Sequence, residues 1–560
     1  MTATSTDADR TRLNELGYAQ ELDRKMSWFS NFAISFSIIS ILAGGTTTYF
    51  LAGLAGGPRM IVLGWVIVGF FALMVGMAMA EIVSVYPTAG GLYYWSAKLA
   101  RKNGAMWSWF TGWFNLIGQI GVIASVDYAL ALFTAYLIGL FDNDFVLDKW
   151  NVFIIFVIML TLHGLINSFG VSLVKLLGDI SVWWHVVGVA IIFVVLMVAP
   201  DNREGFDFIF ESKNLTGWTS TGIIAGLYAS LIGLLLAQYT ITGFDASAHV
   251  SEETHDAGRS ASLAIVRSIY VSAIAALILN IAMLQATPKG TFDTLILGRD
   301  GFLATGGANA LAAPVGGAGA KLLIAICVVG QFFCGMASVT ANSRMIYAFS
   351  RDGAIPGHKF WHRINPKTRT PTNSVWLGVV LSGIVGALSL YQANDYSVAF
   401  FAMTGMCVVG LYIAYVIPIF LRLRNPDFVQ GDWNLGKWSG LVGWTAVAWV
   451  AFITILFFAP PFWPFWPPGG STTFGEGAEA FTVFHLSNFN FTGPIIVSLF
   501  LIVAIWWAVS AKNWFLGPQV QGTPEELRAI EEALEKGDAA TARKLEDAED
   551  ERVTEHQHGH

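Results

Sequence analysis

One carboxylate stands inside an otherwise apolar stretch of this sequence, directly after a glycine and an aromatic ring. The residues are Thr242, Gly243, Phe244 and Asp245. An ionisable group in such surroundings is costly, so function is the first hypothesis for Asp245. Its carboxylate could attract a cationic amine, or it could cap the helix that follows, and we favour the cap. The face of the Phe244 ring could cover an amine, with ordinary apolar packing as the alternative.

A second polar interruption lies in the first apolar stretch of the chain. It comprises five small or hydroxyl-bearing residues: Ser40, Ala43, Gly44, Gly45 and Thr46. Glycine lets another group approach the main chain closely, so we expect the amides near Gly44 and Gly45 to meet a carboxylate. The carbonyls near Gly243 would receive an ammonium group in the same way. The two segments together predict a site for a zwitterion; the alternative is that small residues only let helices pack closely.

A histidine in another apolar stretch could carry the proton of a proton-coupled process. Imidazole titrates near neutral pH, which makes His185 the candidate. A structural histidine, bonded to a helix carbonyl or packed beside Trp183 and Trp184, is the alternative. Sodium is the other candidate coupling ion, because hydroxyl oxygens suit a hard cation. Those oxygens would come from Ser338, Thr340 and Ser343.

Membrane-spanning helices must hold these residues, because the composition is far from that of a soluble domain. Of 560 residues, 54% are hydrophobic and 13% are charged, against about 25% charged in soluble proteins. An apolar stretch of about 20 residues crosses a bilayer as a helix, since lipid offers no partner to open backbone groups. The predicted fold is an all-α polytopic membrane protein with twelve transmembrane helices, at about 30–53, 62–84, 106–138, 151–167, 178–199, 220–247, 262–285, 319–346, 374–391, 396–421, 438–459 and 493–511.

Charge between the predicted helices indicates their orientation. Lys and Arg are concentrated on the side that holds the N-terminus. Cytoplasmic loops carry this excess, so we expect a multi-pass protein of the cytoplasmic membrane with both termini in the cytoplasm. Cys327, Cys334 and Cys407 fall inside predicted helices and are too few for a disulfide framework or a zinc site. We expect the lipid bilayer as a partner, and no metal, cofactor or nucleic acid.

The two interrupted stretches belong to the first and sixth predicted helices, which are five helices apart. This spacing is typical of a five-plus-five inverted repeat with discontinuous helices at matching places. We therefore divide the chain into four parts: a cytoplasmic N-terminal segment at 1–27, a ten-helix transport core at 28–421, peripheral helices 11 and 12 at 422–512, and an acidic cytoplasmic tail at 513–560.

Other charged residues have simpler interpretations. Asp127 and His163 are expected to be satisfied structural groups in the third and fourth helices. Glu81, Arg344 and Arg351 lie at cytoplasmic helix ends, where ion pairs could hold the inner side closed, or where charge could simply aid solubility.

The acidic tail contains one helix signal. Thr523 as N-cap and Pro524 in the first turn predict a helix that begins there, and we expect this helix to be solvated.

Four stretches, in this order along the chain, resemble the amino acid, polyamine and organocation permeases. They are Ser35 to Gly45, Glu81 to Trp95, Thr242 to Thr254 and Asn342 to Pro356. The resemblance is greatest to the amino acid and choline transporter branch, which includes permeases for 4-aminobutyrate, choline and amino acids. It implies a leucine-transporter-like core, with substrate between helices one and six and bordered by helices three, eight and ten. Some proton-driven members place a lysine in helix five, and His185 falls near that position by counting.

These observations predict a permease that moves an amino acid, 4-aminobutyrate or a related amine, by proton-coupled symport. The alternatives are an exchanger, a sodium-coupled carrier, or a sensor or channel on the same scaffold. We expect no enzyme activity, because the sequence has no zinc pair, no nucleophile elbow and no phosphate-binding loop.

Overall fold

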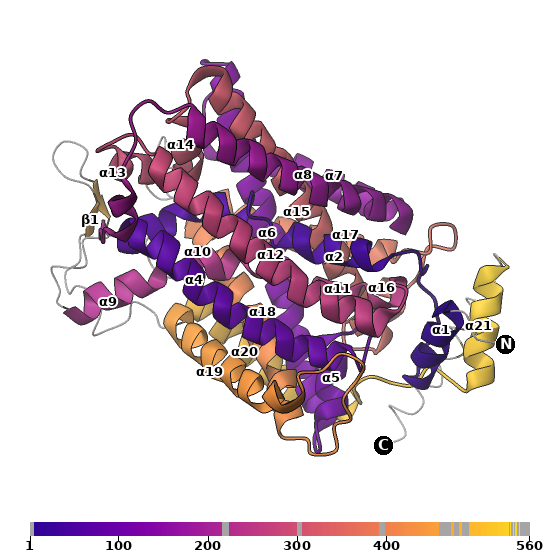
Figure 1. Cartoon of the computed structure of the whole chain (residues 1–560). Helices are drawn as coiled ribbons and strands as arrows, with labels where there is room; N and C mark the ends of the chain where they lie inside the picture. The colour runs from indigo at the N-terminus through magenta and orange to yellow at the C-terminus, as the bar shows by residue number, and fades with distance from the viewer. Residues whose placement is uncertain are drawn as a thin grey trace.

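A computed structural model describes most of the chain. The described residues are 5–215, 223–298, 305–390, 398–458, 472–474, 481–483, 492–536, 538, 541, 544, 545 and 548. Within them, ten helices are long and apolar enough to cross a membrane. They run side by side along the molecule (Figure 1). The bounds of these helices are α4 Tyr49–Val83, α6 Gly104–Phe141, α7 Lys149–Ser168, α8 Val171–Val198, α12 Ala257–Ala286, α15 Gly317–Arg351, α17 Thr372–Ala387, α18 Val398–Leu423, α19 Ser439–Phe458 and α20 Thr492–Val509.

The first and sixth predicted helices are each broken into shorter ones. The first consists of α2 (Trp28–Ile38), α3 (Gly44–Thr47) and the start of α4. The sixth consists of α9 (Ile223–Ile232), α10 (Leu235–Thr240) and α11 (Ala246–His249), followed by the single 3₁₀ turn η3 (Ser251–Glu253). The predicted interruptions of these two helices are therefore present in the structure.

Helix α4 covers more of the chain than predicted, because it joins the end of the first predicted helix to the second. The joint is Gly57, which has φ +71° inside the helical run and is followed by Pro58. Glycine adopts this left-handed conformation without steric cost, and proline supplies no amide hydrogen to the preceding turn. The two predicted helices therefore meet at a kink.

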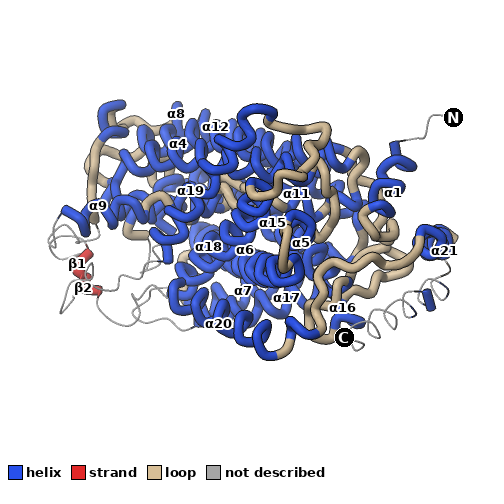
Figure 2. Tube along the Cα trace, turned by 90° about the horizontal axis from the view of Figure 1, so that it is seen from below, coloured by secondary structure: helices blue, strands red, loops and turns tan. Residues whose placement is uncertain are grey.

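Shorter elements lie at the two ends of the molecule. Their bounds are α1 Ser5–Glu15, α5 Leu92–Leu99, α13 Phe292–Ile296, α14 Gly306–Ala312, α16 His358–Trp361, α21 Pro524–Glu535, β1 Thr472–Phe474 and β2 Phe481–Val483. The two strands are antiparallel. Helices α1, α5, α16 and α21 lie at one end, called here the terminal end, whereas α9, α13, α14 and the strands lie at the other (Figures 1 and 2).

Burial separates central helices from peripheral ones. Helix α6 is almost wholly enclosed and packs against α15 and α18, whereas α8 and α20 are largely exposed. The exposed face of α8 carries large apolar side chains such as Leu176, Trp183 and Val194. A continuous apolar surface of this kind fits lipid and not water. Helix α6 therefore forms the centre around which the site is built.

The tail helix begins as predicted but is not solvated. Thr523 accepts from the amide of Glu526, and the Glu526 side chain accepts from the amide of Thr523, which completes a capping box after which Pro524 starts α21. The apolar face of α21, with Leu527 and Ile530, is buried against Ala19 of the N-terminal segment. The expectation of a solvated helix was wrong, because its apolar face has a partner far away in the sequence.

Candidate functional site

The first break is stabilised by its own polar residues. The carbonyl of Ser40 accepts from the amides of Ala43 and Gly44 at 3.0 and 2.9 Å, and the Ser40 hydroxyl also accepts from the Ala43 amide. The Thr46 hydroxyl donates to the carbonyl of Leu42 at 2.8 Å. Hydroxyl groups thus replace part of the helical hydrogen bonding that the break removes, which lipid could not do.

The second break relies on tyrosines from α18. Gly243 has φ +92°, and a Cβ there would collide with Ile38 of α2. The hydroxyl of Tyr412 donates to the carbonyl of Ile241 at 2.9 Å, and the Tyr415 oxygen accepts from the Gly243 amide at 3.3 Å. Glycine is therefore required at 243 both by its backbone conformation and by the close approach of α2.

The two breaks lie against one another. The Ser35 hydroxyl of α2 donates to the carbonyl of Phe244 at 2.9 Å and lies 2.7 Å from the Ser247 hydroxyl. A Cβ on Gly44 would lie 2.8 Å from Cα of Thr240, whereas a Cβ on Gly45 would find only an ordinary contact at 3.9 Å. Packing between α3 and α10 therefore accounts for Gly44, whereas a side chain on Gly45 would meet only an ordinary contact.

Asp245 makes contacts that differ from those of a helix cap. It occupies the N-cap position of α11, but its side chain makes no capping hydrogen bond. Its carboxylate instead accepts from the Tyr415 hydroxyl at 2.6 Å and from the Gln119 amide at 3.4 Å. Its other close neighbour is His249 Nε2, at 3.3 Å. The favoured interpretation of Asp245 as a cap was wrong, because partners on α6, α18 and the next turn of its own helix hold the carboxylate.

A small cavity adjoins this carboxylate. Its volume is about 10 Å³, close to the smallest space that holds one water molecule. Gly243 and Asp245 of the second break and Ile38 at the end of α2 line it. The other lining residues are Ala246 of α11, Gln119 and Val122 of α6, Ser338 and Ala341 of α15, and Leu411 of α18. The two breaks therefore lie beside one small cavity, and Asp245 is the charged residue that lines it.

The aromatic ring beside Asp245 belongs to a cluster with α18. The Phe244 ring is wholly buried, with its centroid 4.9 Å from that of Tyr415 and 6.3 Å from that of Tyr412. The hydroxyl of Thr242 donates to the Gln238 carbonyl within its own segment. Phe244 therefore contacts the tyrosines that hold the second break.

His185 touches the first break. Its Nε2 lies 2.6 Å from the Ser40 hydroxyl, and its Nδ1 lies 2.8 Å from the carbonyl of Ser181 one turn earlier. A carbonyl only accepts, so Nδ1 carries a hydrogen, and in the neutral ring Nε2 accepts from the Ser40 hydroxyl. The structure therefore shows both the carbonyl bond of the structural interpretation and a contact with a predicted site residue.

A second buried histidine pairs with a carboxylate away from the cavity. His163 Nδ1 lies 3.1 Å from Asp127, and both side chains are fully buried. They connect α6 with α7, but among the described residues His163 Nε2 has no hydrogen-bond partner, so the expected satisfied pair is only partly satisfied.

Ion pairs close the terminal end below the site. Arg344 binds Glu253, Arg351 binds Glu252 and Arg422 binds Glu81, at 2.9, 3.2 and 2.8 Å. Arg344, Glu252 and Glu253 are fully buried. Of the two interpretations of Glu81, Arg344 and Arg351, the structure shows ion pairs, with partners that the sequence analysis did not name, and burial excludes a merely solubilising role.

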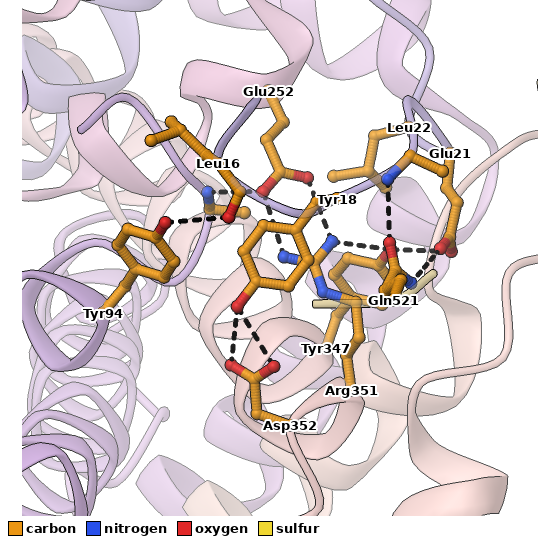
Figure 3. A network of polar contacts seen from close by, with 12 residues as sticks. Leu16, Tyr18, Glu21, Leu22, Tyr94, Glu252, Tyr347, Arg351, Asp352 and Gln521 are labelled. Atoms are coloured by element: carbon orange, nitrogen blue, oxygen red, sulfur yellow. Dashed lines mark hydrogen bonds and ion pairs between the residues drawn. The ribbon is translucent and has the colours of Figure 1, made fainter. Parts of the chain in front are cut away.

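The N-terminal segment and the tail complete this closure (Figure 3). Tyr18 and Tyr93 donate to Asp352 at 3.1 and 2.7 Å, and Tyr347 donates to Glu21 at 2.7 Å. The Gln521 amide group donates to Glu21 at 2.8 Å and accepts from the backbone amide of Ala19. Burial raises the pKa of Asp352 to about 6, although Arg351 and the two tyrosines lower it.

Sequence reasoning missed the partners of Asp245. The family resemblance placed the tenth predicted helix, which is α18, beside the site, but the sequence did not indicate that Tyr415 is the residue that reaches Asp245. Gln119 is a polar residue in the third predicted helix, and its position alone does not indicate that it meets Asp245. His249 lies within the stretch Thr242 to Thr254 and, four residues after Asp245 on a helix, could have been found by spacing.

Comparison with known proteins identifies the family. The family model described as amino acid permease matches residues 26–486. The amino-acid permease BAT1 of Arabidopsis thaliana is 38% identical over 536 residues, covering 91% of this chain and 96% of that protein. The GABA-specific permease of Saccharomyces cerevisiae is 30% identical and covers 91% and 86%. A putative polyamine transporter of Candida albicans is 26% identical and covers 95% and 93%. The chain, with its many apolar helices and its two facing breaks, therefore belongs to the amino acid permease family of multi-pass membrane transporters, and not to an enzyme family.

Proposed function

We propose that the protein moves a small solute with one amino group, such as an amino acid or 4-aminobutyrate, inward across the cytoplasmic membrane by proton-coupled symport. The ten helices and the two broken segments form the twelve spans of a leucine-transporter-like core with two peripheral helices. Both termini lie in the cytoplasm, which makes the terminal end the inner face. The observation that carries the proposal is the carboxylate of Asp245, buried between two helix breaks at a small cavity.

A solute with one ammonium group suits this site better than a polyamine. Among the described residues that line the cavity, Asp245 is the one charged side chain. A polyamine carries several positive charges, and each would need a partner when removed from water. One carboxylate neutralises one ammonium, whereas the substrate carboxylate would meet main chain near Gly45.

Alternating access explains why the cavity is small. The ion pairs of Arg344 and Arg351 hold the terminal end together, which supports a state closed toward the cytoplasm if that end is the inner face. Opening would require these pairs to separate and the cavity to enlarge to hold the solute.

Counterflow in proteoliposomes tests the proposal. Purified protein is reconstituted with internal unlabelled 4-aminobutyrate, glutamate, alanine, choline or spermidine, and entry of each labelled solute is measured. A carrier exchanges labelled for unlabelled solute, and we expect exchange with a monoamine and none with spermidine. Binding of a solute without exchange would identify a sensor, and flux without saturation would identify a channel.

The coupling ion is tested in the same vesicles. We expect an imposed pH gradient, acidic outside, to drive accumulation in sodium-free buffer. Accumulation that needs sodium and does not respond to the pH gradient would exclude the proton as the coupling ion, and with it the coupling role of His185. Sodium bound by the oxygens of Ser338, Thr340 and Ser343 would then be favoured.

A further inference from the structure

We propose that Asp245 and His249 together bind one proton and that this shared proton joins the substrate cavity to the closure of the terminal end. The inference rests on the proposed transport function and names a proton site that differs from His185. It is carried by the hydrogen-bond geometry of the two side chains.

The two groups lie one helical turn apart and are sealed from solvent. Asp245 has 1% of its surface exposed and His249 has none. His249 Nε2 lies 3.3 Å from Asp245 Oδ2, while Asp245 Oδ1 accepts from Tyr415 at 2.6 Å. The carboxylate therefore holds one fixed donor on one oxygen and faces the imidazole with the other.

The imidazole is fixed in one tautomer by the loop at residues 84–91. Nδ1 of His249 lies 2.8 Å from the carbonyl of Ala89. A carbonyl only accepts, so Nδ1 carries hydrogen. Nε2 then either carries a second hydrogen and donates to Asp245, or stands bare. If it is bare and Asp245 is ionised, two acceptors face one another, and the pair carries a net negative charge in a buried site.

A neighbour on α6 makes both protonation states accessible. The Nδ2 atom of Asn115 lies 3.3 Å from His249 Nε2 and can donate to it when the nitrogen is bare. The remaining groups near the pair from other elements are Gln119 of α6 and Tyr415 and Cys407 of α18. Two ion pairs follow farther along the chain, Glu252 with Arg351 and Glu253 with Arg344. The pair can therefore bind or release one proton while Nε2 keeps a hydrogen-bond partner in either state.

The same imidazole is tied to the closure. The carbonyl of Ala89 accepts from His249, and the amide of Ala89 donates to Glu252 at 2.9 Å. Glu252 is the partner of Arg351 in the closed network. When the proton leaves toward the cytoplasm, Nε2 exchanges its bond to Asp245 for one from the Asn115 amide, and this shifts the imidazole that holds Ala89. Proton release would therefore loosen the loop at 84–91, while an incoming ammonium could neutralise Asp245.

Infrared difference spectra between acid and alkaline buffer test the shared proton without any substrate. The wild-type protein should show one carboxyl or imidazole change that disappears in both Asp245→Asn and His249→Gln. His255→Gln, six residues farther along, is the matched control and should keep the change. The proposal is overturned if the carboxyl change that Asp245→Asn removes persists unaltered in His249→Gln, or if the imidazole change that His249→Gln removes persists unaltered in Asp245→Asn.

Transport by two substitutions of the histidine supplies the second test, with 4-aminobutyrate as the probe. His249→Gln keeps a donor at the Nε2 position but does not titrate, and His249→Asn keeps one at the Nδ1 position. In each variant the ratio of accumulation driven by the pH gradient to counterflow should fall several-fold below that of the wild-type protein. Wild-type accumulation in His249→Gln would overturn the proposal. If the wild-type protein itself shows no counterflow with any amine, the proposed function fails, whereas the infrared result decides the proton site independently.

Discussion

At the scale of single residues, the site depends on glycines that no larger residue can replace without a steric clash. Gly243 combines a left-handed backbone conformation with direct contact to Ile38, so two separate physical requirements exclude a side chain there. A third requirement, the close approach of α3 and α10, explains glycine at position 44. Small residues at the breaks therefore serve helix packing as well as any bound solute.

The Gly243→Ala substitution should abolish counterflow and lower the thermal stability of the protein. Gly290→Ala is the matched control, because Gly290 also has a left-handed conformation, φ +77°, but nothing lies within 4 Å of its missing Cβ. We expect the control to cost about 1–2 kcal/mol from backbone strain alone, and Gly243→Ala to cost more. Equal melting temperatures for the two variants would show that α2 yields to the added methyl group.

At the scale of elements, the ion pairs of the terminal end join the ends of several helices. Helix α15 ends at Arg351, with Asp352 as its C-cap residue, and Arg344 lies seven residues earlier in the same helix. These groups meet η3, α5 and the N-terminal segment, which come from distant parts of the sequence. Several buried charges thus hold one helix end in place.

The Arg344→Ala substitution should be strongly destabilising. It leaves Glu253 buried without its partner, which costs about 3–5 kcal/mol in such pairs. The double variant Arg344→Met with Glu253→Gln should recover much of that loss, because no uncompensated charge remains. Thermal melts followed by tryptophan fluorescence measure the difference, with Lys536→Ala in the exposed pair with Glu532 as the control that should change nothing. No recovery in the double variant would mean that the pair itself stabilises the closure.

Acidification should tighten the terminal end. Burial raises the pKa of Asp352 to about 6 from 3.8, so the closed form binds the proton more tightly than an exposed carboxyl does. Its stability therefore falls as the pH rises from about 4 through 6, and it increases when the pH is lowered through that range. Hydrogen exchange of residues 16–22, corrected for intrinsic rates, should slow between about pH 7 and pH 5. The Asp352→Asn variant should lose this dependence, and an unchanged pH profile in that variant would assign the effect to another group.

At the scale of the whole molecule, the two chain ends clamp one face of the helix bundle. Gln521 bridges Ala19 and Glu21, and Glu531 accepts from the Gln20 amide and binds Arg10. The N-terminal segment in turn contacts α5, η3 and α15 (Figure 3). The tail therefore contacts the closure through the N-terminal segment and also directly, because the Gln519 backbone amide donates to Asp352 at 3.4 Å.

The Gln521→Ala, Glu531→Gln double variant should free the N-terminal segment. We expect trypsin to cleave at Arg10, Arg12 or Arg24 several-fold faster than in the wild-type protein, because those bonds become exposed. Glu525→Ala, on the exposed side of α21, is the control and should leave the rate unchanged. Equal cleavage of the double variant and the control would show that the segment is held by the bundle alone.

The sequence by itself determined the properties that depend on local composition and spacing. Apolar stretches of sufficient length predicted the helices, and glycine with hydroxyl residues predicted breaks near Gly44 and Gly243, because a chain in lipid has few other solutions for its backbone groups. Family motifs carried the identity. Only the tertiary structure decided which groups surround Asp245, that α21 is buried, and that His249 links the cavity to the loop at 84–91. Those contacts join residues that are far apart in the chain, and their distances depend on how helices pack, which no local pattern specifies.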